Sequence, residues 1–142
     1  MSTPLLVRHP EPQPTEGFLG YVLRLAEDNG FPANHFDIVV SNIVHHETPA
    51  DSSRRIFAEV QRTLRPGGIY YPVDIYTAAP PPTDVVRRFR SWWNWRWNHE
   101  DWQMEWMHLD SRDAMRRVGL HVEDASLSGS EYEQRNIVAS KI

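Results

Sequence analysis

A short polar cluster in this 142-residue chain has the residue types for acid–base or metal chemistry. His45, His46 and Glu47 directly follow an apolar segment, and such a group could bind a metal ion or transfer a proton. Adjacent residues on an extended backbone point to opposite sides, so two neighbouring histidines should not share one metal. We therefore predict no metal site. The cluster is either an acid–base group or a solvated loop without a chemical role.

A second candidate, Asp74, lies at the end of another apolar segment. Ligands of doubly wound α/β sheets gather at the carboxyl ends of the strands. If the two apolar segments are neighbouring strands, Asp74 shares a sheet edge with the histidines. It is then either a ligand contact or an unpaired surface carboxylate.

The elements that must position these residues form a βαβ unit. Residues 36–44 are rich in β-branched side chains without clean alternation, which predicts a strand covered on both faces. A helix should follow, capped by Asp51 or Ser52 and ended by the glycines in residues 65–68. Residues 69–75 predict a second strand, parallel to the first.

All six tryptophans lie between Trp92 and Trp106, in a segment (residues 84–107) with a helical pattern and an interruption near residues 98–101. They could stack on a planar or cationic ligand. They could stack on nucleic acid, helped by neighbouring arginines. We favour packing, within the fold or across a dimer, because the tryptophans outnumber what one helix face requires.

The remaining segments complete a single predicted domain over residues 16–142, after an extended, mobile arm at residues 1–15 that contains four prolines. Helical spacing predicts a first helix at residues 16–29. A later helix at residues 111–118 should be capped by Asp110, with Asp113 in its first turn. Two strands, at 120–127 and 132–141, should then form a hairpin.

Composition excludes several classes of protein. With no cysteine, the chain has no disulfide, thiolate zinc site or cysteine nucleophile. A net charge of −4 lacks the basic excess of a general nucleic-acid binder, so we expect no nucleic-acid partner. No apolar run approaches twenty residues and the N-terminus lacks a signal-peptide pattern, so we expect a cytoplasmic protein without a membrane partner.

Several segments together resemble the middle and end of a class I S-adenosylmethionine-dependent methyltransferase. They are FDIVVSN at 36–42, HET at 46–48, VQRTLRPGG at 60–68, VD at 73–74, AMRRVGL at 114–120 and NIVASKI at 136–142. The resemblance implies a truncated Rossmann-like α/β fold of about four strands. Two of these are parallel and are followed by a C-terminal hairpin, with flanking helices and a Trp-rich helical insertion.

The resemblance also suggests site residues. It implies cofactor contacts from the ends of the two parallel strands, at Asn42, Ile43, His45 and Asp74. Candidates for catalysis, near the expected substrate, are His46, Glu47, His99 and Glu100.

One family feature is missing from these 142 residues: the glycine-rich loop against which the cofactor lies. Before Phe36, glycine occurs only at positions 17, 20 and 30. We therefore expect S-adenosylmethionine by resemblance, but no cofactor bound by the isolated chain. The first 25 residues resemble a transposition-helper family, as in a chimera formed on a mobile gene.

Two functions remain open from the sequence. The first is a methyltransferase-like module that has lost cofactor binding and catalysis and acts as a dimeric binding or structural unit. The alternative is an S-adenosylmethionine-dependent methyltransferase acting on a small molecule, its cleft completed by a dimer mate or a partner chain. We expect a homodimer, formed through the strand at 36–44 or the Trp-rich helices at 84–107.

Overall fold

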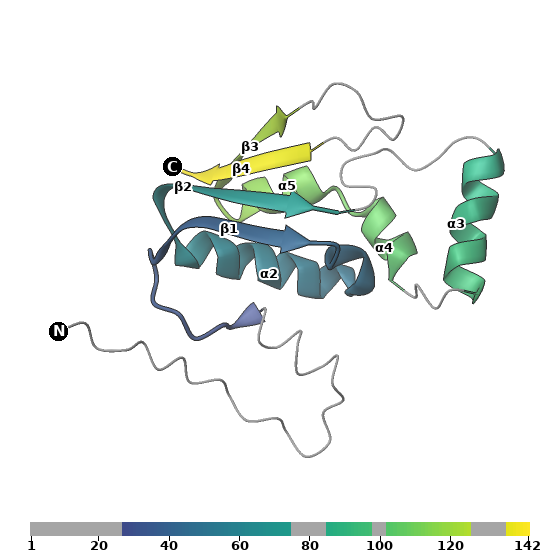
Figure 1. The fold of residues 1–142 in the computed structure, drawn as a ribbon, viewed down its shortest axis with the longest axis horizontal. Helices are drawn as coiled ribbons and strands as arrows, with labels where there is room; N and C mark the ends of the chain where they lie inside the picture. The colour runs from purple at the N-terminus through teal and green to yellow at the C-terminus, as the bar shows by residue number, and fades with distance from the viewer. Residues whose placement is uncertain (1–26, 75–84, 98–101, 126–135) are drawn as a thin grey trace, which may run out of the picture.

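The computed structural model describes residues 27–74, 85–97, 102–125 and 136–142 (Figure 1). Its elements are β1 (Phe36–Asn42), the 3-10 helix η1 (His45–Glu47), α2 (Ala50–Thr63), β2 (Leu64–Val73), α3 (Val85–Trp97), α4 (Gln103–His108), α5 (Ser111–Arg117), β3 (Leu120–Ala125) and β4 (Asn136–Lys141). The expected arm at 1–15 and nearly all of the expected helix at 16–29 lie outside the described residues.

The described strands form one mixed sheet in the order β1-β2-β4-β3. β1 and β2 are parallel, whereas β4 is antiparallel to both β2 and β3. Helices α2 and α5 lie on one side of this sheet (Figure 1). The predicted α/β architecture, with two parallel strands, a C-terminal hairpin and flanking helices, is confirmed.

The core lies between the sheet and these helices. Helix α2 contributes Ile56 and Val60, which lie four residues apart on one face, together with Phe57 beside them. The sheet contributes Tyr70 and Ile137, which like Phe57 are 0% exposed. Full burial of a side chain such as Phe57 stabilises the fold by about 2–3 kcal/mol.

Helix α2 begins and ends differently from the sequence prediction. Its N-cap is Pro49, and no side chain caps it locally, so the expected caps at Asp51 and Ser52 are wrong. Instead, the Ala50 amide donates to Oε2 of Glu105 in α4, at 3.0 Å. That carboxylate is 55 residues away in sequence, which is why local capping rules missed it.

The glycines after α2 do not end the helix. α2 ends at Thr63, and Leu64 is already extended at the start of β2. Gly67 has φ +78° within the range of β2, where the β1–β2 register is irregular between Phe36 and Ile38. Its left-handed backbone therefore serves an irregularity at the start of the strand and not a helix terminus.

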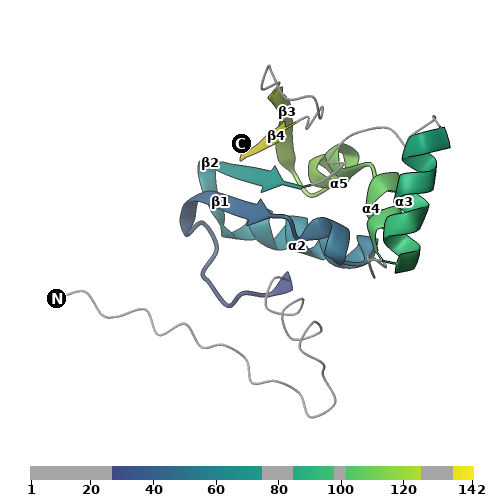
Figure 2. The ribbon, with the colours of Figure 1, turned by 45° about the vertical axis from the view of Figure 1, so that its right-hand side comes forward.

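The prediction that β1 is covered on both faces is wrong for the described residues. Val39 packs against the core, but Ile38 and Val40 on the other face are 64% and 57% exposed. The reason is the layer arrangement: α2 and α5 cover one side of the sheet, and no described helix covers the other (Figure 2). The apolar sequence of β1 thus leaves an open apolar surface.

The C-terminal part follows the sequence expectation closely. The Asp110 carboxylate accepts a hydrogen bond from the Asp113 amide at 2.9 Å and caps α5 as predicted. β3 and β4 form the expected antiparallel pair, and the predicted turn between them lies outside the described residues.

Among the helices that the structure describes, none has the length and hydropathy needed to cross a membrane.

Candidate functional site

The candidate site lies where the parallel strands β1 and β2 end side by side. The Ile43 amide, one residue after β1, donates to the carbonyl of Val73 at 2.7 Å. The next residue of the chain after Val73 is Asp74, and η1 begins at His45. The two polar clusters expected from the sequence therefore meet at one edge of the sheet.

Asp74 is buried and organises the turn after β1. Its Oδ2 accepts hydrogen bonds from the amides of Val44 (3.1 Å), His45 (2.6 Å) and His46 (3.4 Å). Ile43, the residue before these three amides, has φ +52°, a backbone conformation that is costly for a β-branched residue. Consecutive amides that converge in this way form an anion-binding turn, and here the anion is the protein's own carboxylate.

The other Asp74 oxygen is also engaged. Oδ1 lies 2.6 Å from Nδ1 of His46, so a ring N–H can donate to it. The residue is only 5% exposed. Of the two sequence interpretations, an unpaired surface carboxylate is therefore wrong, and direct ligand contact would require Asp74 to release part of this turn.

His45 is enclosed in a network of hydroxyl groups. Its Nε2 lies 2.8 Å from the Tyr70 hydroxyl and 3.1 Å from Oγ of Ser41, and its Nδ1 lies 3.2 Å from Oγ of Ser53. Ser41 and Tyr70 also contact each other, at 2.7 Å. With 0% exposure, the imidazole has no access to solvent.

Burial keeps this network neutral. It lowers the pKa of His45 to about 4, while the nearby Asp74 charge opposes the shift and the neighbouring His46 adds to it. Burial also raises the pKa of the Tyr70 hydroxyl far above its ordinary value. At neutral pH the imidazole is therefore uncharged and the phenol protonated, an arrangement suited to holding structure rather than to moving protons.

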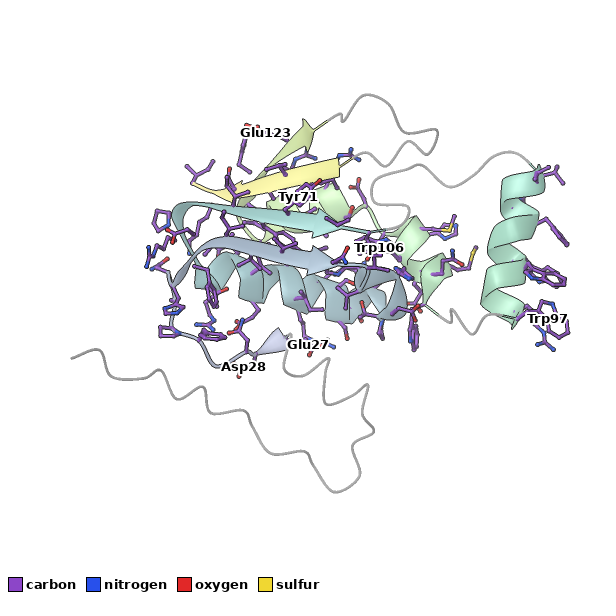
Figure 3. All side chains as sticks on the ribbon, viewed as in Figure 1. Glu27, Asp28, Tyr71, Trp97, Trp106 and Glu123 are labelled. Atoms are coloured by element: carbon purple, nitrogen blue, oxygen red, sulfur yellow. The ribbon has the colours of Figure 1, made fainter. Side chains whose placement is uncertain are left out.

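Aromatic rings complete the enclosure of His45. The Trp106 indole of α4 is stacked on it, with centroids 5.0 Å apart and an interplanar angle of 16°. Phe57 of α2 lies at the same centroid distance from His45, tilted by 43°. Trp106 is itself 2% exposed, and Figure 3 shows it between the ends of the strands and α4. The imidazole thus joins η1, α2 and α4.

Unlike His45, His46 contacts a carboxylate through each of its two ring nitrogens. Its Nδ1 is held by Asp74, and its Nε2 lies 3.3 Å from Oε1 of Glu47. The Glu47 side chain is 49% exposed, whereas that of His46 is 4% exposed. A carboxylate on Nδ1 fixes the orientation of an imidazole, so a general base acting through Nε2 is the chemistry that this group could perform.

The other predicted site residues are more dispersed. Asn42 and Ile43 are exposed at the carboxyl end of β1 and make no contact with the His45 network that the structure records. His99 and Glu100 lie outside the described residues. Sequence reasoning missed Ser41 and Tyr70, although a serine within the apolar run of β1, two residues beyond the core-facing Val39, was a signal for a buried polar partner.

Four of the tryptophans whose side chains the structure describes lie in two contrasting environments. Trp106 packs in the core, as the packing interpretation predicts. In contrast, Trp92, Trp93 and Trp97 of α3 are 46–54% exposed, so packing within the described fold does not account for them. Trp97 lies at one end of α3 and points away from the rest of the molecule (Figure 3).

Comparison with known proteins gives this geometry a family context. The family described as a methyltransferase domain matches residues 4–71. The uncharacterized methyltransferase sll0829 of Synechocystis is 39% identical over 56 residues, which is 39% of this chain and 26% of that protein. The match thus spans about a quarter of the curated relative.

Solved structures agree on the fold. A SAM-dependent methyltransferase from Methanosarcina mazei superposes with a TM-score of 0.54 at 16% identity, over 82% of this chain and 64% of the other. A putative methyltransferase from Haloferax volcanii, solved in complex with the Trm112 methyltransferase activator, gives a TM-score of 0.52 at 22% identity, over 81% and 58%. This chain therefore spans less than two thirds of each of these proteins.

Proposed function

We propose that these 142 residues form a dimeric binding or structural module that binds no S-adenosylmethionine by itself. The starting point is the similarity of the chain to part of a methyltransferase domain of Rossmann-like fold. The observation that carries the proposal is the state of Asp74. Its buried carboxylate accepts hydrogen bonds from three backbone amides and is held against His46. Both carboxylate oxygens are therefore engaged within the chain, three contacts on Oδ2 and one on Oδ1.

Two of the four residues proposed to contact the cofactor, Asp74 and His45, therefore do not fit that role as they stand. Both oxygens of Asp74 are engaged by its own turn and His46, and His45 is neutral and enclosed by Tyr70 and Trp106. Binding a cofactor through either residue would first break buried hydrogen bonds, each of which costs about 1–3 kcal/mol when left unmade. We derive no catalytic step through this cofactor on the described residues.

The glycines that the structure describes after β1 support the same conclusion. Gly67 and Gly68 lie at the start of β2, and Gly119 follows α5 with φ +91°. Each of these glycines is explained by the backbone, through a positive φ at Gly67 and Gly119 and through close backbone contacts at Gly68. Methyl transfer depends on holding donor and acceptor in line, and without a donor site the remaining side chains have nothing to act on.

The dimer part of the proposal rests on β1. In the described sheet β1 pairs only with β2, so its other edge offers unpaired backbone groups. The open face beside that edge carries Ile38, Val40 and Ile69, which are 64%, 57% and 41% exposed. An apolar face next to an unpaired edge is what a second copy of the chain could cover.

Light scattering coupled to size exclusion tests the dimer. We expect a dimer mass at micromolar concentration and a monomer mass for the Ile38→Lys/Val40→Lys variant, because buried lysines would oppose pairing. Val85→Lys is the matched control, since Val85 is 80% exposed on α3, away from β1. A monomeric wild-type chain would contradict the proposal.

A thermal-shift assay tests cofactor binding separately. A ligand that binds only the folded state raises Tm. Since the proposed module binds no cofactor, we expect no change in Tm with 1 mM S-adenosylmethionine or S-adenosylhomocysteine. A dose-dependent rise in Tm would overturn this part and leave the dimer result standing.

The second candidate function is an S-adenosylmethionine-dependent methyltransferase acting on a small molecule, with a cleft completed by a dimer mate or partner chain. The His46–Asp74 pair favours it, because a carboxylate-oriented imidazole beside Glu47 could accept a proton from a methyl acceptor. The Haloferax protein in complex with an activator is a precedent for a methyltransferase fold with a protein partner. Cofactor binding that appears only above the concentration at which the chain dimerises would favour this candidate.

A further inference from the structure

Helix α3 has a composition unlike the rest of the chain. Its thirteen residues include four arginines and no acidic residue, in a protein whose net charge is −4. The segment alone is therefore +4, and the remainder of the chain is −8. This local concentration of positive charge selects for an anionic partner.

The same helix presents a continuous aromatic face. Trp92 and Trp93 follow Phe89 by three and four residues, and Trp97 follows Trp93 by four. The four side chains are 46–57% exposed. Neighbouring rings contact each other along the helix. The ring centroids of Phe89 and Trp92 are 5.7 Å apart, and those of Trp93 and Trp97 are also 5.7 Å apart. Val85, at the start of the helix, is 80% exposed and extends the apolar surface.

The described arginine side chains sit beside this face. Arg88 and Arg96 are exposed, and the guanidinium of Arg96 lies over the Trp97 ring, 4.7 Å from its centroid. Such stacking holds a positive charge at the boundary of an apolar surface, and long arginine side chains can extend from that boundary towards polar groups. In Figure 3, α3 stands at the periphery of the molecule with Trp97 pointing outward.

We propose that α3 binds the surface of an anionic phospholipid bilayer. Interfacial helices of peripheral proteins combine tryptophan and phenylalanine on one side with arginine or lysine around them. Indole rings favour the region between lipid headgroups and acyl chains. The thirteen residues of α3 would extend about 20 Å in the plane of the membrane, because an α-helix rises 1.5 Å per residue.

Two other occupants fit less well. A second copy of α3 would place two sets of arginines together with no acidic residue on either helix, and like charges oppose such pairing. A nucleic acid would supply phosphates for the arginines, but the exposed Val85 and Val86 offer it neither a hydrogen bond nor a ring for base stacking. The expectation of no membrane partner rested on the absence of a spanning segment, which an interfacial helix does not need.

Co-sedimentation of the full chain with vesicles tests the proposal. We expect binding to vesicles of phosphatidylcholine with 30% phosphatidylglycerol and little binding to pure phosphatidylcholine. Replacing two arginines, as Arg88→Gln/Arg96→Gln, should weaken partitioning by roughly twenty-five-fold, since each arginine near an anionic surface contributes about fivefold. Trp92→Ser/Trp93→Ser/Trp97→Ser should abolish binding at low protein concentration, because it removes the inserted rings.

The matched control is Arg54→Gln/Arg117→Gln, which removes two exposed arginines outside α3 and should leave lipid binding unchanged. Circular dichroism checks that each variant is folded. The proposal is overturned if anionic vesicles do not bind the wild-type chain, or if the tryptophan variant binds as well. It is also overturned if α3 instead mediates self-association in light scattering, or shifts a single-stranded oligonucleotide while vesicles stay unbound.

Discussion

The Nδ1 atom of His46 lies 2.6 Å from Oδ1 of Asp74, with the His46 side chain 4% and the Asp74 side chain 0% exposed. The same carboxylate holds the amides that follow β1. At the edge of the sheet where a ligand would be sought, Asp74 and His46 are therefore held in an internal hydrogen-bond network.

Replacing Asp74 tests how much this network contributes. Asp74→Ala should lower the free energy of unfolding by about 3 kcal/mol, because it leaves buried amides and His46 without their partner. Asp51→Ala is the control, since it breaks an exposed ion pair with Arg54 and should change stability by less than about 0.5 kcal/mol. Urea unfolding measures both, and equal small losses would count against a structural role for Asp74.

The protonation of His45 predicts a pH dependence of stability. The pKa of His45 is about 4 in the folded chain, because of burial, and near 6.5 when unfolded. Between these values the unfolded state binds a proton that the folded state does not. The contribution of neutral, buried His45 to the free energy of unfolding is therefore fully present above pH 6.5. It is lost as pH falls towards 4, at about 1.4 kcal/mol per pH unit.

Nuclear magnetic resonance isolates this residue from other titrating groups. The His45 ring signals should stay in the neutral form from pH 7.5 down to about pH 5, unlike those of histidine in an unstructured peptide. A midpoint near 6.5 would show that the ring is accessible to solvent and that the closed network is incorrect.

The tryptophans should differ sharply in their effect on stability. Trp106→Ala should cost about 3–5 kcal/mol, because Trp106 is 2% exposed and stacks on His45. Trp97→Ala, at a side chain that is 54% exposed, should change stability by less than about 0.5 kcal/mol. Guanidinium unfolding gives both values, and a large loss for Trp97→Ala would mean that α3 is packed against the fold in solution.

Gly68 is predicted to be intolerant of any side chain. An added Cβ would lie 2.9 Å from the Arg65 carbonyl oxygen and 3.1 Å from the Phe36 carbonyl oxygen, both of which are backbone atoms. Gly68→Ala should therefore destabilise by about 1–3 kcal/mol. Gly67→Asn is the comparison, because the left-handed backbone there faces open space and asparagine tolerates it. Thermal unfolding that ranks the two variants in the opposite order would contradict this geometry.

Local sequence signals predicted most of the fold. The β-branched run at β1, the core-facing spacing of α2 and the capping pair Asp110 and Asp113 each depend on near neighbours in the chain. The true N-terminal partner of α2 is Glu105, which only tertiary structure brings to Ala50. Capping rules that consider the nearest residues therefore chose Asp51 or Ser52 instead.

The candidate site was harder to predict, for a related reason. Sequence placed His45, His46 and Asp74 at one sheet edge correctly, because parallel strands end together. Whether they face solvent depends on Tyr70, contributed by β2, and on Trp106, contributed by α4. Burial of a histidine is decided by such distant partners, so the sequence could not distinguish a ligand site from a closed network.

The central claim is that this chain alone has no S-adenosylmethionine site, and isothermal titration calorimetry with S-adenosylhomocysteine tests it most directly. The full chain at about 100 μM, titrated to millimolar ligand, should give only heats of dilution. A saturable isotherm with a micromolar Kd would contradict the claim. Its loss in Asn42→Ala would then place the cofactor at the exposed end of β1.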